Sequence, residues 1–387
     1  MATSKKSPRK KPAPMVREVG TVKDSPDLLT ELRALIESAR QHVAQTANAT
    51  LTMLYWRIGH RIATELLQKE RAPYGQEIVY AVGRELTLAY GKGFTDRNLW
   101  HMKRFAEAFP DEKIVSALSM VLSWTHFRQI IYLERPLQRE FYAEMCRIER
   151  WSTRTLEKKI GGMLYERTAI AKRPDAVVEM EISKLREQDH ISTDLIFRDP
   201  YLLDFLGLQG AYSERDLESA ILADMERFLL EMGDGFCFVA RQKRLIIGAD
   251  DFYLDLLFYH RKLRRLVAVE LKLEKFQAAH KGQMELYLRW LDRHERQPGE
   301  EEPIGLILCV GINREEVEVL QLDGSSIRVA EYLTELPERE ALRSRLHQAI
   351  AVARERAPPA TLSPPAETPE PANTVRKPRR KNKGDNA

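Results

Sequence analysis

The chain has 387 residues, of which 43% are hydrophobic and 30% charged, and its net charge is +4. It is long enough for two domains, but it has no apolar run of the about 18 to 20 residues that a membrane span needs and no hydrophobic signal-peptide segment at the N-terminus. The cysteines, Cys146, Cys237 and Cys309, are too few and scattered for a disulfide framework or a zinc site. We therefore expect them to be small core residues of a cytoplasmic protein.

Positive charge is concentrated at the two ends of the chain. Residues 1–20 carry +5 and residues 351–387 carry +4, which leaves −5 for residues 21–350. Because both ends are also rich in proline and basic residues, we predict disordered tails over 1–24 and 351–387 that attract phosphate backbones. Tails that serve only solubility are the alternative.

Residues 25–187 show helical periodicity almost throughout, which predicts an all-α domain. One long or broken helix is expected over 28–70, and shorter helices follow at 77–91, 95–109, 124–133, 136–150 and 152–167. Gly91 or Gly93 fits a left-handed helix end, and Thr95 fits a cap for the next helix.

The helix, glycine turn and helix over 77–109 resemble a helix-turn-helix. We predict that Arg97, Asn98, His101 and Arg104, on the exposed side of the second helix, contact nucleic acid, since such a helix can enter a major groove. A helical hairpin within a bundle is the alternative.

A break near 173–200 separates this domain from a second one, predicted over 188–350. Strands are expected at 236–247, 252–259, 265–273, 304–310 and 326–332, and helices at 214–232 and 278–296, which gives the αβββαβ order of a sheet flanked by helices. Arg241, Lys243 and Arg244 on the first strand are candidate phosphate contacts, although an exposed edge strand is the more ordinary explanation.

The predicted hairpin at 252–273 carries the strongest functional signal. The period of two places Glu270 and Lys272 on one face, and a turn centred near residues 262 and 263 places Asp255 opposite Glu270. Facing carboxylates roughly 5 Å apart repel each other unless a cation lies between them. A hard cation such as Mg²⁺ or Mn²⁺ would remove this repulsion, whereas a solvated charged face is the alternative.

Two neighbouring helices add candidate residues. Glu218 begins a stripe continued by Leu222, Met225 and Leu229, in a helix that Ser213 starts, so this acid needs a partner. The alternative is a boundary glutamate that reaches solvent, with Asp224 as a rival acid. Gln283 lies on the helix after the hairpin, with Tyr287 one turn later.

This combination resembles the PD-(D/E)xK nuclease superfamily, and more closely the YhcG-type proteins. The resemblance rests on DLESAIL, FYLDLLFYH, LVAVELK and GQMELYL and extends over residues 25–350, with Leu254 and Asp255 where the superfamily has a proline-aspartate pair. It implies an α+β protein in which a helical domain precedes a restriction-endonuclease-like α/β core. It also implies that Asp255, Glu270 and Glu218 bind metal, that Lys272 positions or activates the attacking water, and that Gln283 assists.

We therefore predict a nuclease that uses Mg²⁺ or Mn²⁺ to cleave nucleic acid, with DNA as the expected substrate and a second copy or another protein as partner. The alternative is a non-catalytic nucleic-acid-binding or assembly protein with a nuclease-like fold. An NTP-driven enzyme is disfavoured, because no G-x-x-x-x-G-K-[ST] loop occurs.

Overall fold

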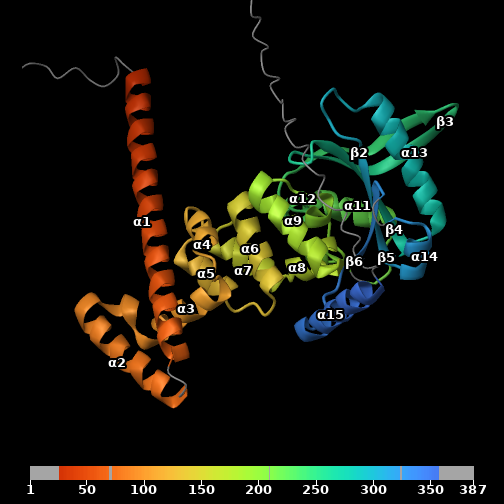
Figure 1. Ribbon diagram of the computed structural model, residues 1–387. Helices are drawn as coiled ribbons and strands as arrows, with labels where there is room; N and C mark the ends of the chain where they lie inside the picture. Colours follow the sequence, from red (N-terminus) through yellow and green to blue (C-terminus); the bar gives the residue numbers. More distant parts are fainter. Residues whose placement is uncertain (1–25, 69–71, 209, 323–324, 357–387) are drawn as a thin grey trace, which may run out of the picture.

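The structure, a computed structural model, describes residues 26–68, 72–208, 210–322 and 325–356 (Figure 1). The tail predicted over 1–24 lies outside the described residues, as do residues 357–387. Residues 351–356 are helical, so the prediction that a disordered tail starts at residue 351 is wrong for these six positions. In the ranges that are described, no helix combines the length and apolar character needed to cross a membrane.

The N-terminal part is all-α, as predicted. Its helices are α1 (Pro26–Gln68), α2 (Ala72–Tyr90), η2 (Lys92–Phe94), α3 (Asp96–Ala108), α4 (Glu112–Ser119), α5 (Trp124–Ile130), α6 (Pro136–Glu149), α7 (Thr153–Gly161), α8 (Leu164–Arg167), η3 (Ala169–Lys172) and α9 (Asp175–Gln188). Helices α4 and α9 were not predicted. The break expected near 173–200 is helical over α9, which buries Val178, Ile182 and Leu185 in the core of the helical part.

Helices α1, α2 and α3 pack closely because glycines lie where they approach. A Cβ atom on Gly59 would lie 1.8 Å from the carbonyl oxygen of Met102, and one on Gly83 would lie 2.7 Å from the backbone nitrogen of Asp96. Thr95 caps α3, as predicted. The α2–turn–α3 unit is therefore firmly held against α1.

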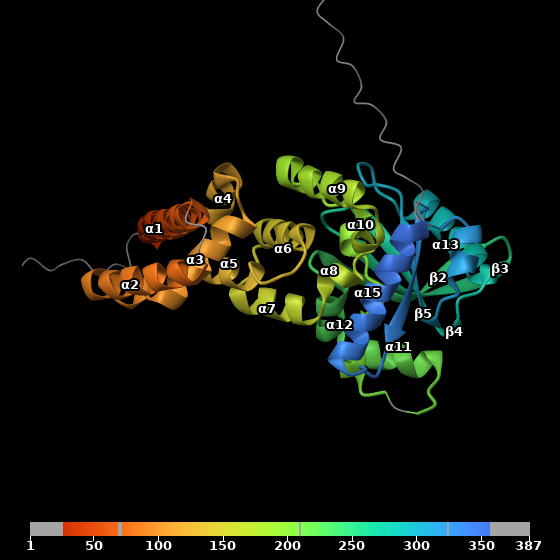
Figure 2. The same cartoon turned by 60° about the horizontal axis from the view of Figure 1, so that its bottom comes forward.

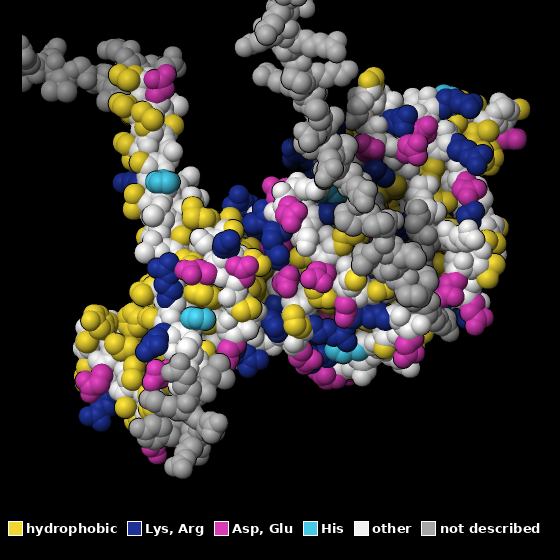
Figure 3. Space-filling view, in the orientation of Figure 1, with side chains coloured by type: hydrophobic (Ala, Val, Ile, Leu, Met, Phe, Trp, Pro, Cys, Tyr) yellow, Lys and Arg dark blue, Asp and Glu magenta, His cyan; other side chains and the backbone are white. Residues whose placement is uncertain are grey.

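The N-terminal half of α1 extends away from the rest of the described chain (Figure 1). Residues 31–47 are exposed throughout, and hydrophobic side chains follow this stretch of the helix (Figure 3). They include Leu32, Leu35, Ile36 and Val43. This half of α1 therefore gains no stability from packing against the other described residues.

The C-terminal part combines helices with one mixed sheet. Its elements are α10 (Thr193–Ile196), β1 (Tyr201–Leu202), η4 (Asp204–Leu206), α11 (Glu214–Ala223), α12 (Met225–Met232), β2 (Phe236–Ile247), β3 (Asp250–His260), β4 (Arg265–Lys275), α13 (Ala278–His294), β5 (Ile304–Gly311), α14 (Arg314–Val319), β6 (Ile327–Leu333) and α15 (Arg339–Arg356). Every predicted strand is present, so the predicted α+β class is confirmed. The helix predicted over 214–232 is interrupted at Asp224, whose backbone leaves the helical conformation.

The strand order is β1-β6-β5-β4-β3-β2, with β2, β3 and β4 antiparallel and the remaining neighbours parallel. Val267, Val269 and Leu271 of β4 pack in the same core as α11 and α12, while Ala268 packs in the core that contains α13. The alternation predicted for β4 is therefore confirmed, and helices cover both faces of the sheet (Figure 1). One cysteine prediction is wrong: Cys237 on β2 is exposed, whereas Cys146 and Cys309 are buried.

Helix α15 returns to the helical part and lies beside α8 (Figure 2). Ile350 belongs to the helical core, and Arg354 donates to the carbonyl oxygen of Ala171. Two further contacts join the helical part to the C-terminal part. Trp151 Nε1 donates to Asp234 Oδ2 at 3.0 Å, and Lys262 in the β3–β4 turn pairs with Glu149. The two parts therefore share packing and polar contacts.

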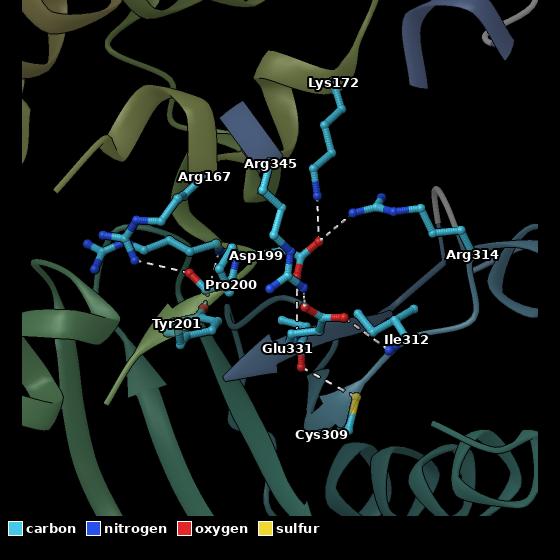
Figure 4. A network of polar contacts seen from close by, with 12 residues as sticks. Arg167, Lys172, Asp199, Pro200, Tyr201, Cys309, Ile312, Arg314, Glu331 and Arg345 are labelled. Atoms are coloured by element: carbon cyan, nitrogen blue, oxygen red, sulfur yellow. Dashed lines mark hydrogen bonds and ion pairs between the residues drawn. The ribbon is translucent and has the colours of Figure 1, made fainter. Parts of the chain in front are cut away.

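Asp199 lies at the centre of a polar network between the same two parts (Figure 4). Its carboxylate accepts from Lys172 Nζ at 2.5 Å, from Arg314 at 3.4 Å and from the backbone N–H of Glu331 at 3.1 Å. Burial alone would raise the pKa of Asp199, but Lys172 and Arg314 hold it below its ordinary value. This ionised carboxylate therefore joins η3, β6 and the start of α14.

Candidate active site

The register of the β3–β4 hairpin is the predicted one. Leu256 pairs with Val269, so the same register sets Asp255 opposite Glu270. Here the two strands are joined by hydrogen bonds from backbone N–H groups to carboxylates instead of backbone carbonyls. The Asp255 N–H donates to Glu270 Oε1 at 3.4 Å, and the Leu271 N–H donates to Asp255 Oδ2 at 2.9 Å. The two carboxylates therefore lie next to each other where the pairing of the strands ends.

Lys272 completes this group. Its Nζ lies 3.2 Å from Glu270 Oε2, and the Glu270 side chain is only 4% exposed. Burial, followed by the neighbouring Asp255 carboxylate, raises the pKa of Glu270 to about 8, and burial also raises the pKa of Asp255. Burial alone would lower the pKa of Lys272, but Glu270 outweighs it and the net shift is upward. The site thus combines a charged ammonium with two acids that resist simultaneous ionisation.

Glu218 reaches this group through a residue that the sequence did not reveal. Ser213 and Asp216 form the capping box that starts α11, and Glu218 is 9% exposed beside the fully buried Leu217. Gln242 Nε2 donates both to Glu218 Oε2 at 2.8 Å and to Asp255 Oδ1 at 3.0 Å. The partner that we expected for Glu218 is therefore the amide of Gln242. The rival acid, Asp224, instead pairs with Arg227 of the following helix, α12.

Gln242 has unusual backbone geometry for a residue within a strand. Its φ is +43°, in the left-handed region, which costs an ordinary residue about 1 to 2 kcal/mol. Its neighbours Arg241 and Lys243 pair with Leu256 and Leu254, so Gln242 lies opposite Asp255. In the sequence, nothing distinguishes this glutamine from the exposed polar residues around it.

Gln283 is connected to the site through Tyr287. Its Nε2 donates to the Tyr287 hydroxyl at 2.6 Å, and that hydroxyl donates to the carbonyl oxygen of Tyr253 on β3 at 3.5 Å. Burial raises the pKa of Tyr287, and the charge of Glu270 adds to the shift. The Q-x-x-x-Y pair on α13 thus lies behind the hairpin acids.

The donor atoms fit a hard divalent cation. Among the residues that the structure describes, no group of three or more His, Cys, Asp or Glu side chains is arranged to hold a metal ion. Asp255 and Glu270 are the two site acids that lie directly next to each other, whereas the Gln242 amide lies between Glu218 and Asp255. Mg²⁺ commonly binds proteins through only one or two carboxylates and completes its shell with water and phosphate oxygens. A cation here would also relieve the repulsion that raises the pKa of Glu270.

The nucleic-acid candidates on α3 differ in their surroundings. Arg97 is exposed, whereas Asn98 donates to a carbonyl of the preceding turn. His101 Nδ1 is hydrogen-bonded to the Tyr132 hydroxyl, and the Arg104 guanidinium lies 4.5 Å from the centre of the Tyr132 ring. Several of these side chains therefore fasten α3 within the helical part, and nucleic-acid contact by this helix stays a prediction.

The candidates on β2 lie at a sheet edge among the described strands. Arg241 is exposed, Lys243 pairs with Glu295 at 2.7 Å, and Arg244 pairs with Asp251 at 2.8 Å. These contacts agree with the edge-strand explanation, so phosphate binding by Arg241 and Lys243 also stays a prediction.

Comparison with known proteins identifies the family. Residues 194–347 match the family described as YhcG PDDEXK nuclease domain, and residues 31–167 match the DUF1016 N-terminal domain. The Escherichia coli (strain K12) protein named "Putative nuclease YhcG" is 33% identical over an alignment of 353 positions, and the match covers 83% of this chain and 93% of that protein. The chain belongs to the YhcG family. The match to its nuclease domain spans the stretch from Glu218 to Gln283, and the family and this relative support a nuclease.

Two solved structures show a remote resemblance to this YhcG-family chain. A repair endonuclease from Pyrococcus abyssi is 19% identical, with a TM-score of 0.24, and the match covers 34% of this chain and 50% of that one. An EndoMS–dsDNA complex is 18% identical, with a TM-score of 0.23, and the match covers 32% of this chain and 46% of that one.

Proposed function

We propose that this YhcG-family protein is a metal-dependent endonuclease that hydrolyses phosphodiester bonds, with DNA as its substrate. The observation that carries the proposal is the adjacent pair of Asp255 and Glu270 with Lys272 at 3.2 Å from Glu270. A protein that only bound nucleic acid would have no use for two buried acids that repel each other.

The residues of the hairpin have distinct roles in this proposal. Asp255 and Glu270 would hold Mg²⁺ or Mn²⁺, with Glu218 as the third acid. A divalent cation supplies charge that stabilises the transition state of phosphoryl transfer. Lys272, kept in place by Glu270, favours hydroxide over water at the attacking position and offsets phosphate charge. Gln283 assists by fixing Tyr287 behind the acids.

We further propose that the helical part binds the substrate or a partner protein, and that the protein acts in the cytoplasm. Arg97, Asn98, His101 and Arg104 on α3, together with Arg241 and Lys243 on β2, are the proposed nucleic-acid contacts. The exposed apolar residues of α1 support the expectation of a protein partner, since large exposed apolar surfaces commonly mark interaction sites. The mass of the protein in solution would establish whether that partner is a second copy.

A cleavage assay tests the function directly. The parent chain is incubated with single-stranded, duplex and branched DNA and with RNA, in Mg²⁺, in Mn²⁺ and in a chelator. Cleavage should need the cation, should be lost in Asp255→Asn, and should persist in Asp250→Asn, which changes an exposed acid on the same strand. Binding without cleavage under every condition would instead favour the non-catalytic alternative.

A further inference from the structure

Gln242 is the residue that joins two of the three site acids. Its Nε2 atom lies 2.8 Å from Glu218 Oε2 and 3.0 Å from Asp255 Oδ1, so a single amide group spans α11 and β3. A primary amide nitrogen carries two N–H groups, which match the two acceptors. Neither carboxylate therefore has to face the other without a donor between them.

We infer that Gln242 is a positioning residue of the proposed cation site, which holds Glu218 in register with Asp255 before the cation binds. The inference rests on the proposed function, because it concerns the same three acids. Gln242 is not itself assigned a contact with the cation or the substrate. It acts through Glu218, which comes from a separate helix and is the acid that most needs to be held in place.

The backbone at Gln242 supports this role. A left-handed φ of +43° is unfavourable for a residue with a Cβ, and strained residues of this kind persist mainly where the surrounding structure or function requires them. Glycine would be the ordinary choice if the turn of the backbone were the only requirement. At this position the glutamine side chain has a contact of its own, since its amide donates to both Glu218 and Asp255.

This contrast makes Gln242→Gly the informative variant. Glycine accepts the left-handed backbone, so Gln242→Gly removes the amide without adding backbone strain, and the thermal midpoint shows that the variant is folded. Removing a residue that orients a metal ligand typically weakens metal affinity by about 10-fold to 100-fold. A purely structural role for Gln242 predicts no such loss.

A matched control exists elsewhere in the chain. Gln321, after α14, is also an exposed glutamine with a left-handed φ, +51°. Gln321→Gly makes the same backbone change outside the proposed cation site, so it should leave metal affinity unchanged. Gln242→Asn provides a second test variant: asparagine tolerates left-handed backbone, but its amide is one carbon shorter and should not span both acids.

The experiment is calorimetric titration of the full-length protein with Mn²⁺ alone, with thermal midpoints measured on the same samples. Gln242→Gly and Gln242→Asn should each weaken Mn²⁺ binding about 10-fold to 100-fold, while Gln321→Gly binds like the parent. In a double-mutant cycle, Gln242→Gly should cause little further loss when Glu218 is already Gln, because the two residues act together.

The outcomes separate this inference from the proposed function. If the parent binds Mn²⁺ and both Gln242 variants bind it equally well, Gln242 has no positioning role and the cation site stands. If Gln242→Gly weakens binding equally with and without Glu218, it does not act through Glu218 and the inference is wrong. A parent chain that binds no Mn²⁺ overturns both the inference and the cation-dependent function.

Discussion

Replacing Glu270 by glutamine should remove a pH dependence of stability that the proposed site creates. Glu270 keeps its proton in the folded protein up to about pH 8, whereas its ordinary pKa is 4.5. The folded protein therefore binds more protons than the unfolded chain between these values, and the free energy of unfolding should fall as the pH rises through this window.

The size of the effect follows from the shift. Each pH unit in this range costs about 1.4 kcal/mol, so the full window is worth on the order of 5 kcal/mol without a cation. Glu270→Gln carries no titratable group and should lose this dependence, which makes it more stable than the parent near pH 8. A cation present at a hundred times its dissociation constant should raise the free energy of unfolding of the parent by about 2.7 kcal/mol and leave that of the variant unchanged.

Scanning calorimetry from pH 5 to 8.5, in chelator and in Mn²⁺, measures these differences. A change of about 1 kcal/mol in the free energy of unfolding shifts the thermal midpoint by roughly 2 to 4 °C for a unit of about 150 to 250 residues. Glu274→Gln, an acid on the same strand with a side chain 55% exposed, is the control and should keep the parent's profile. A parent whose stability in chelator is flat from pH 5 to 8, or a Glu270→Gln protein that gains as much from Mn²⁺ as the parent, would refute the reasoning.

Three further predictions concern activity and substrate binding. Lys272→Ala should reduce cleavage by roughly two orders of magnitude while Mn²⁺ binding persists. The control is Lys275→Ala, which changes an exposed lysine on the same strand and should cleave like the parent. Equal turnover in both variants would reject the role of Lys272. Arg97→Ala combined with Arg104→Ala should change preference among substrates in a binding assay, and unchanged binding to every substrate would make the helical part an assembly module. Deleting residues 1–20 and 358–387 should weaken binding to all nucleic acids alike. It should also reduce the slope of log affinity against log salt by about 0.9 per lost phosphate contact on duplex DNA. An unchanged slope would leave the tails with a role in solubility.

The hairpin could be predicted because its register depends on local rules. The position of the turn and the strand period of two together set Asp255 opposite Glu270, and the observed pairing of Leu256 with Val269 has the same register. The two faces of β4 could also be predicted, since each face packs against a different helix layer. Local pattern was sufficient where neighbouring residues determine the geometry.

Prediction failed where distant contacts determine the geometry. The predicted stripe from Glu218 to Leu229 requires one continuous helix, but the helix is interrupted at Asp224. The fully buried apolar residues of α11 are instead Leu217 and Ile221. Gln242 faces Glu218 and Asp255 only because β2, β3 and α11 meet there. A contact that needs three separate elements leaves no periodic signal in any one of them.

The two family regions do not correspond to two independent packing units. The turn of the hairpin that carries Asp255 and Glu270 is anchored on the helical part, where Lys262 pairs with the 8%-exposed side chain of Glu149. Ile350 of α15 belongs to the helical core although it lies beyond the nuclease-domain match. Cutting the chain at the predicted boundary near residue 187 would leave Glu149 without its cation and remove Ile350 from its neighbours, both of which destabilise. The hairpin thus connects the helical part at its turn with the candidate site at its other end, and the site's acids are best studied in the full-length chain.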